Sequence, residues 1–294
     1  MRTLAITGDD FGASRAVNRA IVAAYDRGVL TAASLMVTGD AADEAVAFAR
    51  ARPGLAMGLH LVLVDGKAAS PPSAIPKLVD AAGRFRGGAL VAGLRYQFSR
   101  ETRRELAREV RAQLQRFVDT GLTLAHVDGH HHQHLHPVVL DALARSARAL
   151  SLRIPAIRLP SEELGLAQLI DPGHLGENLA SHAVCSLLRR HGKRRLAASG
   201  VGFSERVYGL LATGRITESY LLALIPRIRA ARVEIYCHPA DPLPGERAAG
   251  APTTGPAELR ALTSPRVREA IEKAGFVASR RPAFVTARVP ESHA

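Results

Sequence analysis

The feature that most constrains the fold of this chain is the alternation of short apolar runs with segments of helical periodicity. Such an alternation predicts βα units, in which a helix returns the chain so that the next strand lies parallel to the last. We therefore expect an α/β structure built on a mostly parallel sheet. The predicted strands are residues 3–7, 33–37, 55–63, 122–128, 152–160, 232–239 and 282–287.

Three helices have recognisable boundaries. The first is expected over residues 14–27, with a serine cap at its start, and the second over residues 41–53, where a proline ends it. Residues 64–98 are rich in Gly, Pro and Ala and are expected to form a long loop over one end of the sheet. The clearest helix covers residues 99–120. Its apolar face is formed by Leu106, Val110, Leu114, Phe117 and Val118.

The segment from residue 161 to residue 230 is helical in pattern and strongly basic, and no strand is predicted within it. No linker rich in Gly, Ser or Pro separates it from the rest of the chain. The sequence therefore predicts a single domain over residues 1–294, with a helical insertion at about 161–230.

The charge balance is strongly positive. The chain has 39 Lys and Arg against 27 Asp and Glu, a formal net charge of +12. This excess either serves solubility or attracts an anionic surface, which would be a membrane or a nucleic acid. Aromatic residues make up only 4% of the chain, and no nucleic-acid-binding motif is recognised. We therefore expect no nucleic-acid partner.

The cysteines and the amino-terminal residues indicate in which cellular compartment the protein is expected. Cys185 and Cys237 are too few for a disulfide framework or a cysteine zinc site, and they favour a reducing environment. No signal peptide is recognised, and no apolar run approaches the roughly 20 residues that cross a bilayer. We expect a cytoplasmic protein, either free or peripheral on the inner membrane.

Polar side chains stand at the carboxyl ends of four predicted strands. They are Asp9 and Asp10, His60, the stretch HVDGHHHQHLHP at residues 126–137, and His238. The carboxyl ends of parallel strands meet at one edge, where α/β proteins place their active sites. Each group alone has an ordinary explanation, such as a helix cap, a hydrogen-bonded core histidine or a turn residue. Their joint placement favours a functional site.

Imidazole and carboxylate groups together suit zinc and similar divalent metals. A catalytic site of this kind uses three protein ligands and leaves one position open, so one Asp and two His are sufficient. The stretch at 126–137 holds six of the twelve histidines of the chain. If the backbone stays extended after Asp128, then His130, His132 and His134 lie on one face and the intervening residues on the other. Not all of these rings can reach one metal ion, so some are expected to support the site or to contact substrate.

Four segments resemble a known family. They are ITGDDFG (6–12), GLHLVL (58–63), HVDGHHHQH (126–134) and YCHP (236–239). In order and spacing they resemble the signature segments of the YdjC-like carbohydrate deacetylases, and the resemblance covers nearly the whole chain. It implies a distorted (β/α) barrel and hydrolysis of the amide bond of an N-acetylated sugar. One small departure is Gly129, where many relatives have Ser.

The resemblance also implies roles for individual residues. Asp10, His60 and His130 would bind one divalent metal ion, with zinc or magnesium as the expected cofactor. Asp9 would act as the general base and His238 as the general acid. The other polar residues of the fourth predicted strand and its extension would support the ligands or contact substrate. These are His126, Asp128, His132 and His134.

Within the family, residues 63–76 and 181–216 most resemble the hopanoid-biosynthesis-associated branch. This resemblance implies that the substrate is a glycolipid, an N-acetylglucosaminyl group on a bacteriohopanetetrol. Residues 175–198 combine leucine and valine with arginine and lysine. Such a composition fits either a basic amphipathic helix on an anionic membrane or an ordinary solvated face.

Other functions remain open on the sequence alone. The same chemistry could act on soluble chito-oligosaccharides, and a non-catalytic metal- or nucleic-acid-binding protein is an alternative of a different class. Two His and one carboxylate also form the ligand set of non-haem iron oxygenases, although the Asp9–Asp10 pair and the distant His238 favour hydrolysis. The oligomeric state is open, and a homodimer is one option.

Overall fold

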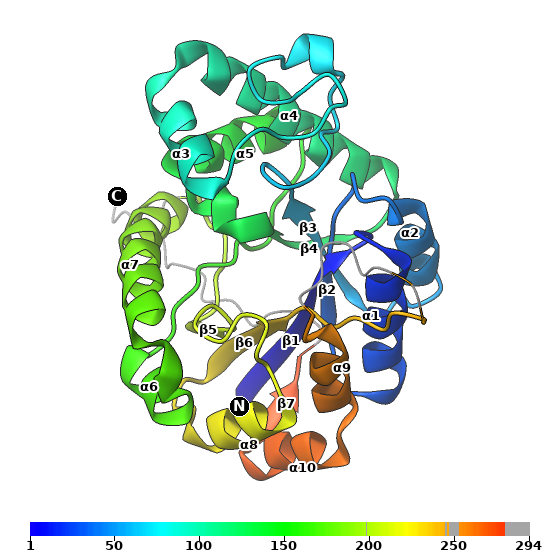
Figure 1. The fold of residues 1–294 in the computed structure, drawn as a ribbon, viewed down its shortest axis with the longest axis vertical. Coiled ribbons are helices and arrows are strands. Elements are labelled where there is room, and N and C mark those ends of the chain that lie inside the picture. Colours follow the sequence, from blue (N-terminus) through cyan, green and yellow to red (C-terminus); the bar gives the residue numbers. More distant parts are fainter. Residues whose placement is uncertain (198, 245, 247–252, 280–294) are drawn as a thin grey trace, which may run out of the picture.

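The computed structural model describes residues 1–197, 199–244, 246 and 253–279. Figure 1 shows a sheet in the middle of the molecule with helices around its outside. The strand predicted at residues 282–287 lies outside the described residues. Among the residues that are described, no helix is long and apolar enough to cross a bilayer.

In the described part of the chain, seven strands form one sheet, and the paired strands all run parallel. Their order is β4-β3-β2-β1-β6-β5, and β7 pairs with the first residues of β1. This arrangement confirms the expected α/β class. The strands are β1 (Arg2–Phe11), β2 (Ala32–Leu35), β3 (Ala56–Leu61), β4 (Leu124–Gly129), β5 (Arg206–Tyr208), β6 (Arg232–Cys237) and β7 (Phe276–Ala278).

The segment 152–160 joins the two edges of the sheet without forming a regular strand, so the prediction of a strand there is wrong. Val127 of β4 makes two backbone hydrogen bonds to this segment, of 2.9 and 3.0 Å. Just beyond it, the N–H of Ser161 donates to the carbonyl of Val207 in β5 at 3.3 Å. The two prolines of the segment have no N–H, which prevents a continuous ladder. With this irregular connection, the sheet curls into the expected distorted barrel.

Helices cover the outside of the sheet, and two predicted helix starts are present. Oγ of Ser14 accepts a hydrogen bond from the N–H of Val17, and Oγ of Ser99 accepts one from the N–H of Thr102. These bonds satisfy donors that have no partner within the helix. The helices are α1 (Arg15–Arg27), α2 (Ala42–Arg50), α3 (Ala89–Phe98), α4 (Arg100–Asp119), α5 (Pro137–Ala149), α6 (Leu164–Ile170), α7 (Leu175–Ala197), α8 (Glu218–Leu224), α9 (Gly255–Thr263) and α10 (Pro265–Lys273).

Two segments differ from expectation. Residues 64–98, expected to form a loop, include α3 at their end. Residues 161–230, expected to be helical, include β5, which pairs with β6. A three-residue strand is too short to show alternation, and α3 is so apolar on its exposed side that no polar face marks it as a helix.

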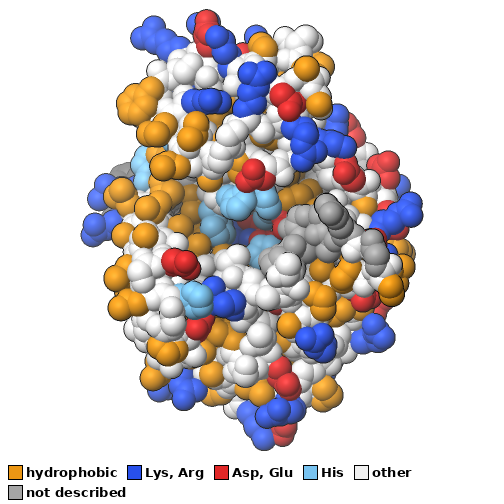
Figure 2. Space-filling view, in the orientation of Figure 1, with side chains coloured by type: hydrophobic (Ala, Val, Ile, Leu, Met, Phe, Trp, Pro, Cys, Tyr) orange, Lys and Arg blue, Asp and Glu red, His pale blue; other side chains and the backbone are white. Residues whose placement is uncertain are grey.

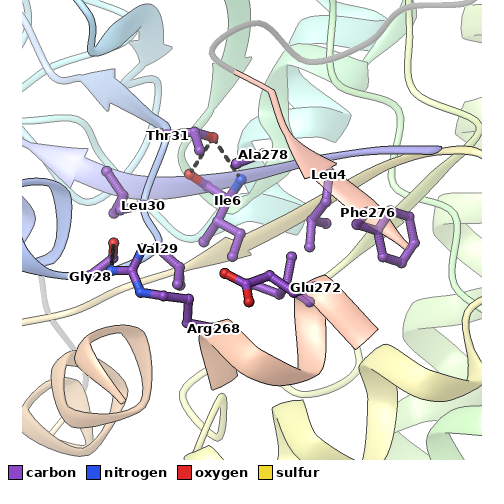
Figure 3. Close-up of a pocket in the computed structure, with 11 residues that line it drawn as sticks. Leu4, Ile6, Gly28, Val29, Leu30, Thr31, Arg268, Glu272, Phe276 and Ala278 are labelled. Atoms are coloured by element: carbon purple, nitrogen blue, oxygen red, sulfur yellow. Dashed lines mark hydrogen bonds between the residues drawn. The ribbon is translucent and has the colours of Figure 1, made fainter. Parts of the chain in front are cut away.

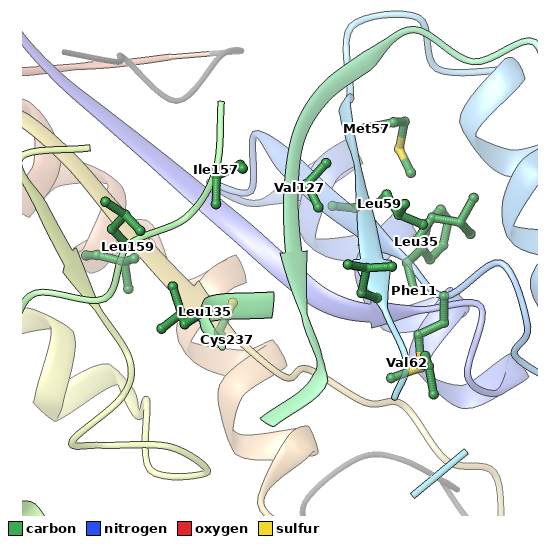
Figure 4. Packing of buried hydrophobic residues seen from close by; sticks show 14 of the residues in the cluster. Phe11, Leu35, Met57, Leu59, Val62, Val127, Leu135, Ile157, Leu159 and Cys237 are labelled. Atoms are coloured by element: carbon green, nitrogen blue, oxygen red, sulfur yellow. The ribbon is translucent and has the colours of Figure 1, made fainter. Parts of the chain in front are cut away.

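Buried apolar side chains fill the space between the sheet and its helices. Figure 4 shows part of this core, where Phe11, Leu35 and Leu59 from neighbouring strands lie together. α4 buries the apolar face predicted for it, apart from Val118, which is 39% exposed. Each fully buried side chain of this size stabilises the fold by roughly 1.5–3 kcal/mol relative to exposure. This core fixes the strand ends that carry the polar groups.

Candidate metal centre

The polar side chains predicted at strand ends gather at one edge of the barrel. Asp9 and Asp10 come from the end of β1, His60 from β3, and His130 from the turn directly after β4. Figure 2 shows histidine side chains together in a hollow near the middle of one face. They converge because these strands are parallel and present their carboxyl ends to the same side.

Asp10, His60 and His130 form a compact cluster. Oδ1 of Asp10 lies 3.2 Å from Nε2 of His60 and 3.1 Å from Nδ1 of His130. Each residue offers one ligand atom, and the three atoms lie within 4.8 Å of one another. Asp10 has a φ of 61°, so its backbone departs from the extended conformation of the residues before it in β1. The side chains of Asp9 and Asp10 have different partners.

The cluster fits a divalent metal ion. Oδ2 of Asp10 is buried and has no hydrogen-bond partner, and Nε2 of His60 is buried and makes no well-aligned hydrogen bond, although it lies 3.2 Å from Oδ1 of Asp10. A buried polar atom left unpartnered destabilises a fold by about 1–3 kcal/mol, so such atoms normally contact something. One carboxylate and two imidazoles are also a common donor set of catalytic metal sites. The unpartnered atoms and the donor chemistry therefore both indicate a metal ion at this cluster.

Asp128 contacts the ring nitrogen of His60 that does not face Asp10. Nδ1 of His60 donates to Oδ1 of Asp128 at 2.7 Å, which fixes the ring with Nε2 toward Asp10. Burial lowers the pKa of His60, but the charge of Asp128 and the contact with Asp10 outweigh it and raise that pKa to about 10. Burial likewise raises the pKa of Asp10, but its contacts with His130 and His60 hold it far below the usual value. The pocket therefore favours positive charge between these side chains.

Arg158 connects three carboxylates behind the cluster. Its guanidinium donates to both oxygens of Asp9, at 2.6 and 2.8 Å. It also lies 2.7 Å from Oδ2 of Asp128 and 2.9 Å from Oε1 of Glu234. Burial lowers the pKa of Arg158, but the charges of these carboxylates raise it well above its usual value. The side chain therefore stays charged and fixes the orientation of its partners.

The buried charges of this region do not cancel. Asp9, Asp128 and Glu234 are buried carboxylates that face the buried guanidinium of Arg158, and the buried carboxylate of Asp10 faces His60 and His130 instead. If the four carboxylates are ionised and His60 is protonated, four negative charges and two positive charges leave a formal excess of two negative charges. Uncompensated buried charge is strongly unfavourable. The excess favours a bound divalent cation in the cluster.

His126 belongs to the support of Asp128. Nε2 of His126 lies 2.9 Å from Oγ of Ser34 and 3.4 Å from Oδ2 of Asp128. Ser34 in turn donates to the same carboxylate oxygen at 2.6 Å. Asp128 is therefore held on several sides while it orients His60.

His132 and His134 contact other parts of the same network. Nε2 of His134 donates to the backbone carbonyl of Arg158 at 2.9 Å. Burial lowers the pKa of His134 to about 4, so this ring is neutral near pH 7. Nε2 of His132 lies 2.9 Å from the hydroxyl of Tyr236 in β6. His134 therefore ties the turn after β4 to the neighbouring segment 152–160, and His132 ties it to β6.

The turn after β4 differs from the extended backbone expected there. Residues 130–135 form a 3-10 turn in which His131 and His132 have φ values of 50° and 54°. These left-handed residues turn successive rings in different directions. As a result His130 faces the cluster, while His131 lies 3.3 Å from Asp65 at the exposed rim.

His238 lies just past the end of β6 and is anchored through its backbone. Its N–H donates to Oε2 of Glu258 at 2.6 Å. Burial raises the pKa of Glu258. Nδ1 of the His238 ring is buried and has no hydrogen-bond partner, and the ring centroid lies 5.8 Å from that of Tyr236. The residue therefore has a fixed backbone and an uncommitted ring nitrogen.

Sequence reasoning missed Arg158, Glu234 and Ser34, which complete the network. A signal for two of them was available. Arg158 and Glu234 are charged residues inside apolar runs, IPAIRLP and VEIYC. A charge in such a run is buried only when it is paired, so it predicts an ionic partner somewhere in the fold. Ser34 had no comparable signal.

A separate cavity lies beside the first half of β1. Figure 3 shows Leu4, Ile6, Leu30 and Phe276 among the side chains that line it, together with Arg268. The lining is mostly apolar and includes none of the predicted site residues. This cavity is therefore distinct from the metal centre.

Known proteins resemble this chain in sequence and fold. The sequence pattern of the YdjC-like protein family matches residues 3–273. The chain is 31% identical to a chitooligosaccharide deacetylase of Salmonella paratyphi B over 285 residues, which are 94% of this chain and 96% of that relative. It is 42% identical to a carbohydrate deacetylase of Brevibacillus brevis over 159 residues, which are 53% of this chain and 59% of that relative.

A crystal structure from Enterococcus faecalis has a similar fold. That protein is described as a candidate cellobiose-phosphate cleavage protein. It has a TM-score of 0.68 and 26% sequence identity, and the match covers 95% of this chain and 97% of the other.

The fold and the site define a parallel α/β barrel with a buried carboxylate–histidine cluster at the carboxyl ends of its strands. The chain belongs to the YdjC-like family, whose sequence pattern covers nearly all of it.

Proposed function

We propose that the protein is a metal-dependent N-deacetylase, a hydrolase that removes the acetyl group from an N-acetylglucosaminyl group. The observation that carries this proposal is the convergence of Asp10, His60 and His130 with unpartnered ligand atoms, beside the clamped carboxylate of Asp9. The relatives named as carbohydrate and chitooligosaccharide deacetylases support the same reaction class.

In this proposal Asp10, His60 and His130 hold one divalent ion. When bound, the ion supplies Lewis acidity, which polarises a carbonyl and lowers the pKa of water. Zinc and magnesium are the two candidates, and the pair of imidazole ligands favours zinc.

Two residues move protons in the proposed reaction. Asp9 takes a proton from the water that attacks the acetyl carbonyl carbon, and Arg158 keeps its carboxylate in one orientation. His238 delivers a proton to the sugar nitrogen as the carbon–nitrogen bond breaks, for which its uncommitted ring nitrogen is suited. The products are acetate and the free amino sugar.

We infer that the sugar is carried on a lipid, as an N-acetylglucosaminyl group on a hopanoid such as bacteriohopanetetrol. The resemblance of residues 63–76 and 181–216 to the hopanoid-associated branch supports this substrate. A soluble chito-oligosaccharide is the second candidate. It is supported by the Salmonella relative, which matches this chain along nearly its whole length.

Acetate release tests both candidates. Purified protein loaded with zinc or with magnesium is incubated with N-acetylglucosaminyl bacteriohopanetetrol in detergent and, separately, with diacetylchitobiose. If the glycolipid is the substrate, its kcat/KM exceeds that of the disaccharide. A higher kcat/KM for the disaccharide supports the soluble substrate, and the absence of acetate from either contradicts the deacetylase proposal.

A further inference from the structure

The helix α3 presents an exposed apolar strip. Leu90, Val91, Leu94 and Phe98 are 78%, 46%, 52% and 79% exposed. They recur at helical spacing, and the opposite side of the helix is buried. Single exposed apolar side chains are ordinary, but four on one ten-residue helix make a patch of the kind that marks a contact surface.

A second group of exposed apolar side chains is spread over the outer side of the first half of α7. Its members are 48–69% exposed, and the opposite side of the helix packs on the protein. They are Leu175, Leu179, Val184 and Leu187. Towards the end of the helix the exposed side chains become cationic.

The basic residues of α7 do not all face outward, in contrast to the expectation for an amphipathic helix. Arg189 donates to a backbone carbonyl, and Arg195 forms an ion pair with Asp141. Arg190 and Arg194 are exposed. These two are the arginines of α7 best placed to contact a partner surface.

Both helices flank the turn that carries the histidines. On α3, the ring of Tyr96 lies 5.8 Å from that of His136 at the end of this turn, and its hydroxyl donates to the carbonyl of Leu63 at 2.9 Å. α7 packs against the same turn and against α5. In Figure 2 the hydrophobic side chains over α3 and α7 lie beside the hollow that contains the histidines. A surface that contacted the strip on α3 and the exposed side of α7 would therefore lie next to the mouth of the site.

Arginines surround the strip on α3. Residues 84–104 contain one acidic residue, Glu101, which pairs with Lys77. Apolar side chains bordered by cations suit the surface of an anionic bilayer, where the former enter the acyl boundary and the latter contact headgroups. A second copy of this chain in an isologous contact would instead bring like charges together. The exposed cations of this segment are Arg84, Arg86, Arg95, Arg100, Arg103 and Arg104.

We propose that α3 and the first half of α7 dock on an anionic lipid bilayer and hold the mouth of the site at the membrane surface, an inference that rests on the proposed glycolipid deacetylase function. Leu90, Leu94 and Phe98 enter the interface, and the arginines beside them contact the headgroups. A sugar linked to a membrane lipid then reaches the metal centre while its lipid stays in the bilayer.

Vesicle flotation tests the docking directly. The full chain is mixed with phosphatidylcholine vesicles, with and without phosphatidylglycerol, at low and high salt. The variant L90S/L94S/F98S removes the apolar strip, and R95Q/R100Q removes two exposed cations. V118S/V277S is the matched control, because both valines are exposed but lie outside α3 and α7. All variants are also assayed for acetate release from a soluble N-acetylglucosamine oligomer and for oligomeric state by ultracentrifugation.

The proposal expects wild type and V118S/V277S to float with anionic vesicles, and L90S/L94S/F98S to bind about tenfold more weakly or worse. R95Q/R100Q should lose the salt-sensitive part of the binding. The docking proposal is overturned if wild type does not bind anionic vesicles. It is also overturned if L90S/L94S/F98S binds them as tightly as wild type does. A wild-type dimer that L90S/L94S/F98S dissociates, without vesicle binding, assigns the strip to a second copy. If vesicle binding is as expected but no sugar releases acetate, the docking stands and the deacetylase function fails.

Discussion

Both carboxylate oxygens of Asp9 accept hydrogen bonds from the guanidinium of Arg158, although the two residues lie 149 positions apart in the chain. Asp9 lies near the end of β1, and Arg158 lies on the irregular segment that joins the sheet edges. The same guanidinium reaches Asp128, which orients His60. The side chain of Arg158 thus fixes the orientation of Asp9, the proposed base. Through Asp128 it also fixes the orientation of His60, a proposed metal ligand.

Removal of one proposed ligand should remove the metal. His60→Ala should lose most bound zinc, because two donor atoms cannot match the affinity of three. Elemental analysis after dialysis measures this directly. His174→Ala is the control, since His174 is partly exposed and faces Glu177 on the surface. A His60→Ala protein with full metal content would show that the cluster is not the metal site.

The contact behind His60 should tune metal affinity without abolishing it. Asp128→Asn removes the charge that orients the ring, and the affinity for zinc should fall by about 10- to 100-fold. Competition with a chromogenic chelator gives the dissociation constant. Asp26→Asn, which breaks a surface pair with Arg52, should leave it unchanged. Equal affinities in the two variants would argue against a role for Asp128 in ligand orientation.

Proton transfer should be separable from metal binding. Asp9→Asn and His238→Ala should retain the metal and lower kcat on the order of 100-fold or more, as expected for a lost general base or acid. Metal content and acetate release are measured on the same samples. Asp65→Asn at the rim should stay near the wild-type rate, because Asp65 contacts only the exposed His131 among the residues of the turn. Normal turnover in either variant removes that residue from the mechanism.

Arg158 should matter for stability and for turnover in distinguishable ways. Arg158→Met leaves buried carboxylates without their partner and should destabilise the fold by about 3–5 kcal/mol. Arg206→Gln, which breaks the half-exposed pair with Glu163, should cost about 1 kcal/mol or less. Urea unfolding gives the free energy of unfolding of both variants.

Arg158→Lys keeps the charge but cannot donate hydrogen bonds to both oxygens of Asp9, so a folded protein with reduced kcat is expected. A fully active Arg158→Lys variant would contradict the orienting role.

Glu162 should make stability depend on pH. It is buried and accepts hydrogen bonds from the N–H groups of Leu210 and Leu211, and burial raises its pKa from 4.5 to about 7. The folded protein therefore holds this proton more tightly than the unfolded chain does. The resulting stability is fully present below about pH 4.5 and is lost as the pH rises through about 7, a change of about 3 kcal/mol.

The variant Glu162→Gln isolates this effect, because the amide keeps the accepting oxygen and cannot ionise. Relative to that of wild type, its free energy of unfolding should increase as the pH rises from about 5 to about 8. Glu101→Gln, at an exposed position, should follow wild type throughout. A constant difference between Glu162→Gln and wild type across this range would show that Glu162 does not titrate there.

The sequence predicted the parallel α/β class and the edge on which the site lies. The reason is local: apolar runs that alternate with helical periodicity force parallel strands, and parallel strands bring their carboxyl ends together. Asp9, Asp10, His60 and His238 each lie in the last part of such a run or just beyond it. Their convergence could therefore be expected without knowledge of which strands are neighbours.

Two predictions of backbone conformation were wrong. They are the strand at 152–160 and the extended backbone after Asp128. The first failed because prolines interrupt its ladder, and the second because His131 and His132 adopt left-handed conformations. The prolines are visible in the sequence, so the irregular segment could have been predicted from it. The left-handed turn depends on tertiary contacts that place it between distant strands. Local propensity carries no record of those contacts.

The sequence by itself therefore determined that carboxylates and imidazoles would meet at one edge of a parallel sheet. The tertiary structure alone decided that Arg158 would join Asp9, Asp128 and Glu234, that His130 would face Asp10 while His131 faced the rim, and that α3 would expose its apolar strip beside the histidines. The physical reason is that periodicity reports how each segment meets the core, whereas pairing among buried charges depends on which segments the closed barrel brings together.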